Sequence, residues 1–115
     1  MMINKKMKIG LAIGLIAIAL FFVIRAHDNN DNISAEDVAK CLTSKGIKMY
    51  GSITCSHCKE QKEIFGDAFQ YIDYIECTID GDLCKDLIGV PAWGIDGKIY
   101  YGAKSLNELK SSSGC

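Results

Sequence analysis

The stretch that decides the fold of this chain is Cys55-Ser56-His57-Cys58. It follows a strand candidate, Ile47 to Ile53, and it opens a segment from Cys55 to Phe69 that is predicted to be a helix. The face of this helix that is expected to be buried carries Cys58, Gln61, Ile64, Phe65 and Ala68. In the first turn of a helix, two intervening residues bring the cysteine sulfurs close enough to form a disulfide. A Cys-x-x-Cys pair between a strand and a helix therefore favours a thiol–disulfide redox site over its alternatives, a structural disulfide or half of a zinc site.

The two cysteines of this pair are predicted to have different roles. The helix N-terminus stabilises a thiolate on the outer sulfur, so we predict that Cys55 is the attacking thiol. Cys58 lies one turn on and faces the core, which makes it the predicted resolving thiol. His57 would add positive charge beside the thiolate and make the disulfide a better oxidant. The alternative for His57 is a surface histidine without a role.

The residues around this stretch predict an α/β fold. In chain order, we expect a helix capped by Ser34 and ended by Gly46, the strand at 47–53, the helix at 55–69, a strand at 71–78, a short helix within 82–87, strands at 92–95 and 98–101 joined by Asp96-Gly97, and a last helix opened by a capping box of Ser105 and Glu108. This order predicts a mixed four-stranded sheet flanked by helices.

Charge is distributed unevenly along the 115 residues. Residues 1–25 carry four basic side chains and no acid, whereas residues 26–115 carry nine lysines and fourteen acids. A mildly acidic domain has no electrostatic footprint for nucleic acid, so we exclude nucleic-acid binding.

The basic N-terminal segment contains sixteen uncharged residues, Ile9 to Ile24. As a helix this run reaches about 24 Å against a hydrocarbon core of roughly 30 Å, and flanking Lys8 and Arg25 could snorkel to extend it. We expect residues 1–26 to form an N-terminal transmembrane anchor, with a cleaved signal peptide as the alternative. Residues 27–33 are a polar tether, and residues 34–115 form the folded domain. The preceding lysines predict a cytoplasmic N-terminus and an extracytoplasmic C-terminal domain, on the periplasmic or extracellular face.

Six cysteines agree with an exported domain, because disulfides persist in oxidising compartments. Cys41 and Cys115 could pair with each other, or remain as a buried thiol and a loose one. A zinc site built from Cys55, Cys58, Cys77 and Cys84 is disfavoured, because six residues separate the second pair, more than the two to four of a usual zinc knuckle. No metal and no cofactor is predicted.

The only proline, Pro91, lies in Gly89-Val90-Pro91-Ala92-Trp93, at the entrance to the third predicted strand. Alone it would be an ordinary trans proline at a strand start. With a Cys-x-x-Cys pair upstream, we expect a cis bond between Val90 and Pro91 and a position beside Cys55 and Cys58.

A set of short motifs runs from Ala39 to the C-terminus. They are Ala39-Lys40-Cys41-Leu42, Lys48-Met49-Tyr50-Gly51, Cys55-Ser56-His57-Cys58-Lys59-Glu60-Gln61-Lys62-Glu63, Tyr74-Ile75-Glu76-Cys77, Val90-Pro91-Ala92-Trp93, Gly97-Lys98, Tyr101-Gly102 and Ser105-Leu106. In this order they resemble the thioredoxin superfamily. They are most similar to the thioredoxin-like domain that is fused to, or partners, bacterial and plant homologues of vitamin K epoxide reductase.

The resemblance implies a protein thiol–disulfide oxidoreductase that acts on exported cysteine-containing proteins. It implies a structural disulfide between Cys77 and Cys84, and a substrate-binding turn at Val90 and Pro91. The partner it implies is a quinone-linked membrane thiol oxidase, resembling vitamin K epoxide reductase, which reoxidises the domain.

Three residues depart from the family's pattern: Ser56 replaces a proline, Thr54 replaces an aromatic residue, and Met49 replaces the acid that many thioredoxins bury beneath the cysteines. Without that acid no buried carboxylate takes the proton from Cys58, so an oxidase or isomerase direction is favoured. The alternatives are a membrane-tethered disulfide reductase, a copper- or zinc-handling thiol module, and an inert domain held by three disulfides.

Overall fold

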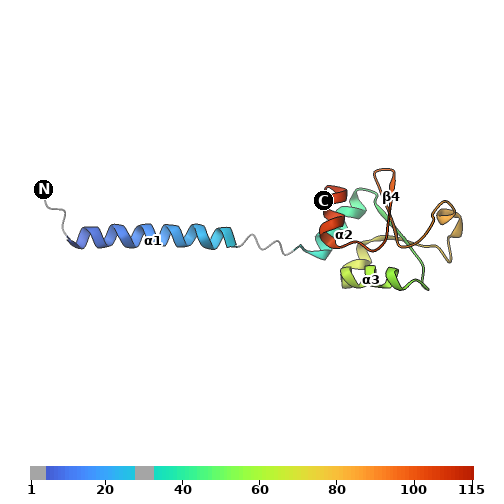
Figure 1. Cartoon of the computed structure of the whole chain (residues 1–115), viewed down its shortest axis with the longest axis horizontal. Coiled ribbons are helices and arrows are strands. Elements are labelled where there is room, and N and C mark those ends of the chain that lie inside the picture. The colour runs from blue at the N-terminus through green and yellow to red at the C-terminus, as the bar shows by residue number, and fades with distance from the viewer. Residues whose placement is uncertain (1–4, 28–32) are drawn as a thin grey trace. The chain divides into compact units, whose positions relative to one another are not determined.

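The computed structural model describes residues 5–27 and 33–115, and the chain divides into two units, Met1–Asn32 and Ile33–Cys115. The first unit contains helix α1 (Lys5–His27), shown in blue in Figure 1. Most of the tether predicted at 27–33 lies outside the described residues.

The prediction that residues 1–26 form a transmembrane helix is wrong. Within the part of the chain that the structure describes, no helix combines the length and the apolarity that crossing a membrane requires. The physical reason lies in the sequence of α1: its uncharged run is sixteen residues, about 24 Å of helix, and four of its seven other residues are Lys or Arg.

The second unit has the α/β element order predicted from the sequence. Its elements are α2 (Ala35–Ser44), β1 (Lys48–Gly51), α3 (Ser56–Phe65), the 3₁₀ helix η1 (Gly66–Tyr71), β2 (Asp73–Glu76), the 3₁₀ helix η2 (Gly81–Cys84), β3 (Ala92–Ile95), β4 (Lys98–Tyr101) and α4 (Leu106–Ser113). The side chain of Ser34 caps α2, and Ser105 with Glu108 forms the predicted capping box of α4.

The four strands form one mixed sheet in the order β2-β1-β3-β4. Strand β1 pairs with β2 in parallel and with β3 antiparallel, and β3 pairs antiparallel with β4. The mixed four-stranded sheet predicted from the sequence is therefore confirmed. In this register Met49 on the central strand β1 lies between Tyr74 and Trp93.

Two helical segments differ from their predicted extents. The helix expected at 55–69 ends at Phe65, because Gly66 adopts φ 56° and the chain continues as η1. Ile64, expected on the buried face of this helix, is 40% exposed. The segment expected to be helical within 82–87 forms only the single 3₁₀ turn η2.

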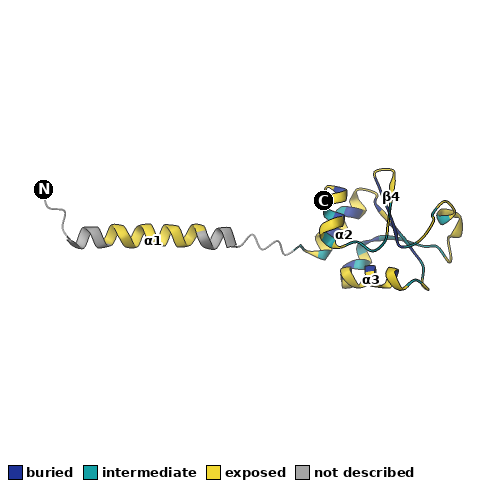
Figure 2. Ribbon diagram, in the orientation of Figure 1, coloured by how far each residue is buried: buried dark blue, intermediate teal, exposed yellow. Residues whose placement is uncertain are grey.

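The core lies between the sheet and the helices, where the buried segments of α2, α3 and the central strands are drawn in dark blue in Figure 2. Its largest fully buried side chains are Trp93, Leu42, Met49, Ile95, Leu109, Gln61 and Cys58. Cys58 and the polar Gln61 are thus both core residues, on the same helix.

Candidate active site

The side chain of Cys55 caps the N-terminus of helix α3. Cys55 is the N-cap residue, with extended backbone angles, and the backbone N–H of Cys58 donates to its Sγ at 3.2 Å. This sulfur therefore takes the place of the oxygen that caps most helices, beside backbone N–H groups that carry the positive end of the helix dipole. Such a position stabilises negative charge on sulfur.

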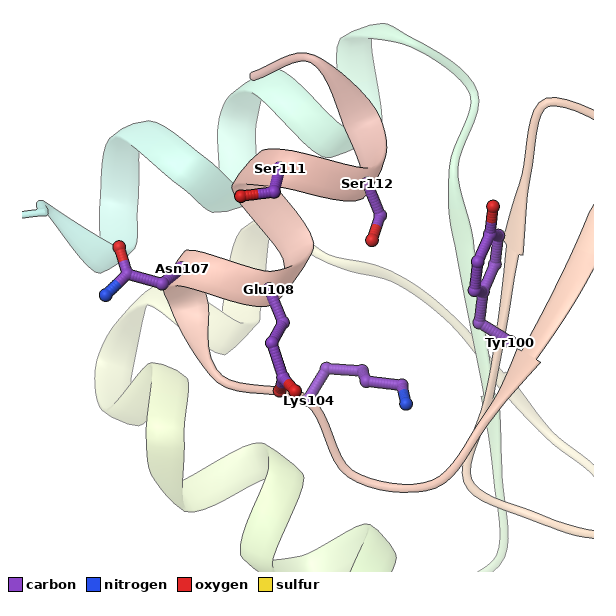
Figure 3. A pocket seen from close by; sticks show the side chains of 6 residues that line it. All are labelled: Tyr100, Lys104, Asn107, Glu108, Ser111 and Ser112. Atoms are coloured by element: carbon purple, nitrogen blue, oxygen red, sulfur yellow. The ribbon is translucent and has the colours of Figure 1, made fainter.

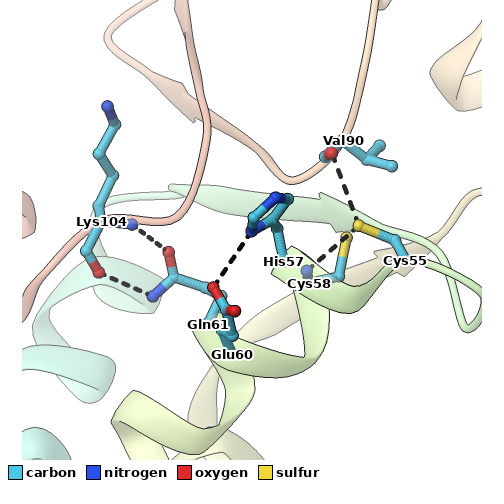
Figure 4. Close-up of polar contacts among 7 residues, drawn as sticks. All are labelled: Cys55, His57, Cys58, Glu60, Gln61, Val90 and Lys104. Carbon is cyan, nitrogen blue, oxygen red and sulfur yellow. Dashed lines mark hydrogen bonds and ion pairs between the residues drawn. The ribbon is translucent and has the colours of Figure 1, made fainter.

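The two thiols of the pair differ in exposure. Cys55 is half-buried, whereas the side chain of Cys58 is 1% exposed, and neither is in a disulfide. Burial raises the pKa of the Cys58 thiol to about 11, and its interaction with Cys55 adds to the rise. Cys58 is consequently protonated at neutral pH, and of the two cysteines only Cys55 is partly exposed. Figure 4 shows both side chains at the start of α3.

The turn at Val90 and Pro91 faces this exposed sulfur. The Val90–Pro91 peptide bond is cis, and the Cys55 thiol donates to the Val90 carbonyl oxygen at 3.6 Å. Pro91 itself is buried, and Val90 is half-buried. The structure thus brings together four of the predicted site residues, Cys55, Cys58, Val90 and Pro91.

His57 lies on the exposed first turn of α3, but it has a partner there. Its Nδ1 is 3.1 Å from Oε2 of Glu60, and the two side chains are 71% and 61% exposed. A carboxylate at this distance offsets the charge of an imidazolium. The effect of His57 on a Cys55 thiolate is therefore weaker than the sequence alone suggested.

The remaining four cysteines form two disulfides, neither of which includes Cys55 or Cys58. Cys77 is bonded to Cys84, seven residues later, and Cys41 is bonded to Cys115, 74 residues later. The second bond links α2 to the C-terminus, which answers the question that the sequence left open for these two residues. Among the residues described, no cluster of three or more His, Cys, Asp or Glu side chains could hold a metal ion.

Sequence reasoning missed a carboxylate that holds the loop before Cys55. The Glu76 side chain accepts hydrogen bonds from the Ile53 backbone N–H at 3.0 Å, the Thr78 hydroxyl at 2.7 Å and the Tyr74 hydroxyl at 2.8 Å. Desolvation alone would raise the pKa of Glu76, but these hydrogen bonds outweigh it and lower the pKa to about 2. The only sequence signal was the position of Glu76 at the end of a strand parallel to β1.

A surface cavity of about 330 Å³ lies between β4 and α4 (Figure 3). It is lined by Tyr100, Lys104, Asn107, Glu108, Ser111 and Ser112, none of which belongs to the predicted redox site. Neither Cys55 nor Cys58 lines this cavity. Its one carboxylate, that of Glu108, already accepts a hydrogen bond within the capping box.

Comparison with known proteins agrees with this chemistry. No family model matches the chain. Thiol-disulfide oxidoreductase LTO1 of Arabidopsis thaliana is 42% identical to it over 88 residues, which cover 67% of this chain and 23% of that protein. This similarity supports a thiol–disulfide oxidoreductase. The chain spans about a quarter of the length of that relative, and the comparison does not extend to a partnership with a vitamin K epoxide reductase.

Proposed function

We propose that this protein exchanges disulfides with exported cysteine-containing proteins, with Cys55 as the attacking thiol and Cys58 as the resolving thiol. The observation that carries the proposal is the pairing of a half-buried N-cap sulfur with a fully buried thiol one turn behind it. A disulfide that served only as a structural link would not need the helix position that stabilises a thiolate.

In the oxidising direction, a substrate thiolate attacks Sγ of Cys55 in the Cys55–Cys58 disulfide. The bond to Cys58 breaks, and Cys58 leaves and takes up a proton, which its raised pKa of about 11 favours. A second substrate thiolate then attacks the substrate sulfur of the mixed disulfide and releases Cys55 as a thiolate. Two electrons pass from the substrate dithiol to the cysteine pair.

The turn at Val90 would hold the substrate during this exchange. Its carbonyl oxygen already accepts from Cys55, so a substrate segment beside Cys55 lies within reach of the same backbone. Backbone pairing of this kind binds extended peptides with little dependence on their side chains. Such pairing suits an enzyme with many protein substrates.

The direction we propose is that of an oxidase or isomerase. Met49, in place of a buried acid, is fully buried, so no carboxylate there takes a proton from Cys58. The helix N-terminus stabilises the reduced state, and the His57–Glu60 pair limits what His57 adds. We expect a reduction potential between about −180 mV, as in protein disulfide isomerase, and about −250 mV, short of thioredoxin.

The two additional disulfides support an oxidising compartment, and we propose that the domain acts outside the cytoplasm. There it needs an electron acceptor after each oxidation of substrate. A membrane thiol oxidase that resembles vitamin K epoxide reductase would fill this role, by accepting the electrons of the Cys55–Cys58 dithiol.

Equilibration of the cysteine pair with glutathione buffers tests the direction, alongside assays of insulin reduction and of peptide oxidation. We expect oxidation of a dithiol peptide and a potential above about −250 mV. A potential below that value would make the protein a disulfide reductase. Absence of both activities would refute the proposed function.

A further inference from the structure

Gln61 is a fully buried polar residue one turn after Cys58 on α3. Its Oε1 accepts two hydrogen bonds, from Nε1 of Trp93 at 3.0 Å and from the Lys104 backbone N–H at 2.6 Å. Its Nε2 donates to the Lys104 carbonyl oxygen at 2.9 Å. A buried amide with three such partners is a specific arrangement, since polar side chains are rarely this buried.

These three hydrogen bonds join α3 to β3 and to the connection between β4 and α4, and Figure 4 shows the two that link Gln61 to Lys104. Gln61 lies on the helix that carries both cysteines. Trp93 lies on β3, two residues after Pro91, and its ring also packs 6.0 Å from that of Phe65 on α3. Lys104 lies in the connection between β4 and α4. Gln61 is therefore a direct link between the cysteine helix and the strand that begins at the Val90–Pro91 turn.

Few side chains other than a carboxamide can make the three hydrogen bonds that Gln61 makes. An apolar side chain of similar size would leave the Trp93 N–H and both backbone groups of Lys104 without partners. An ionised glutamate could accept from the two N–H groups but has no hydrogen to donate to the Lys104 carbonyl oxygen, and its charge would be buried. A protonated glutamic acid, in contrast, reproduces one acceptor oxygen and one donor.

We propose that Gln61 is a positioning residue for disulfide exchange, which holds α3 against β3 so that Cys55 stays in register with the Val90 carbonyl. The inference rests on the proposed function and adds the residue that aligns the attacking sulfur with the surface that binds protein substrates. Loosening this link moves Cys55 relative to Val90. Turnover of a protein substrate, which needs both groups, then falls, whereas alkylation of Cys55 by a small reagent does not.

The test is Gln61→Glu, with the same substitution at the exposed Gln70 as its matched control. Gln70 donates only to the Asp67 carbonyl oxygen. Dividing each rate by that of the wild-type protein at the same pH removes the titrations that the proteins share. For Gln61→Glu we expect kcat/KM on a dithiol peptide to fall about tenfold at about pH 8 and to return to within about twofold at about pH 5. Gln61→Met is expected to stay low at both pH values, and Gln70→Glu to stay near wild-type.

Two further readouts separate positioning from a general loss of structure. Alkylation of Cys55 by iodoacetamide should change by less than about threefold in each variant. Trp93 is the only tryptophan, so its emission reports on the hydrogen bond to Gln61 without turnover. We expect this emission to shift between about pH 5 and pH 8 in Gln61→Glu and not in Gln70→Glu. If Gln61→Glu does not fold, the near-isosteric Gln61→Met carries the test, with kcat/KM expected to fall about tenfold while alkylation of Cys55 changes by less than about threefold.

The proposal is overturned if Gln61→Glu and Gln61→Met keep wild-type kcat/KM at both pH values, or if peptide turnover and Cys55 alkylation fall in parallel. It is also overturned if Trp93 emission in Gln61→Glu does not depend on pH. A wild-type protein that neither oxidises nor reduces peptides would instead refute the proposed function, and the emission measurement would still decide whether Gln61 holds Trp93.

Discussion

Two regions of this molecule present a half-buried cysteine sulfur and use it differently. Cys55 is the N-cap residue of α3. Its sulfur accepts a hydrogen bond from the Cys58 backbone N–H, and its thiol donates one to the Val90 carbonyl oxygen. Cys41 lies within α2, equally half-buried, and is bonded to Cys115. Exposure therefore does not distinguish the two sulfurs. The difference is the position of each sulfur on its helix, because only the N-terminal position lies beside backbone N–H groups that have no carbonyl partner within the helix and can stabilise a thiolate.

The largest expected effect comes from removing the Cys55 sulfur. We expect Cys55→Ser to abolish peptide oxidation and insulin reduction, because the remaining thiol of Cys58 is buried and protonated. Cys58→Ser should instead trap a mixed disulfide between Cys55 and the substrate, which mass spectrometry detects. The double substitution of Cys41 and Cys115 by Ser is the control and should keep activity. Substantial turnover by Cys55→Ser would mean that the roles are assigned to the wrong sulfur.

Removal of the disulfides should lower stability rather than activity. In the chain-entropy view, loss of the Cys41–Cys115 bond, which spans 74 residues, lowers the free energy of unfolding by about 4 kcal/mol. Loss of the Cys77–Cys84 bond, which spans seven, lowers it by about 2.5 kcal/mol. Urea denaturation of the two double Ser variants measures both values. The reverse ranking would show that local contacts, and not loop length, dominate.

Glu76 takes no part in the exchange, but its carboxylate holds the loop before Cys55 through the Ile53 backbone N–H. Its pKa of about 2 lies below the ordinary value of 4.5, so ionised Glu76 stabilises the folded state above about pH 4.5. This contribution is lost as the pH falls toward 2. We expect Glu76→Gln to be less stable than wild-type by about 1 kcal/mol at about pH 6, after allowance for solvent screening, and the difference to vanish near pH 2. A difference that is independent of pH would contradict the assignment.

The smallest expected effect concerns His57. Because Glu60 lies 3.1 Å from it and both side chains are exposed, His57→Ala should lower the reduction potential of the pair by only about 10–20 mV. Glu60→Gln should raise it by a similar amount, since the Glu60 carboxylate then no longer opposes the effect of His57 on Cys55. Glutathione equilibration resolves shifts of this size. A change of about 60 mV or more in His57→Ala would restore His57 to a dominant role.

The sequence predicted those features that depend on local pattern. Alternation and turn residues predicted the strands at 92–95 and 98–101 with the bounds that β3 and β4 have, and the Ser105–Glu108 spacing predicted the capping box. The early end of α3 was missed, because the predicted helical face continues past Phe65 to Ala68, whereas Gly66 at φ 56° ends the helix. Gly66 is a local stop signal like Gly46, but the apolar periodicity on either side of it favoured a longer helix.

The features that the sequence did not predict depend on residues far apart in the chain. Gln61 was expected on the buried face of its helix, but its partners Trp93 and Lys104 lie 32 and 43 residues away. Glu76 reaches Ile53 only because β1 and β2 pair in register. The transmembrane prediction failed for a different reason: no described helix is both long and apolar enough to cross a membrane, and the uncharged run of α1 is only sixteen residues.

The proposed mechanism of disulfide exchange requires that Cys55, and not Cys58, is the nucleophile. Alkylation of the reduced wild-type protein by iodoacetamide at about pH 7, followed by peptide mapping, tests this directly. Cys55 should carry the label, and Cys58 should stay unmodified until the pH approaches the pKa of about 11 to which burial raises its thiol. Labelling of Cys58 first, or of both cysteines at equal rates, would contradict the account.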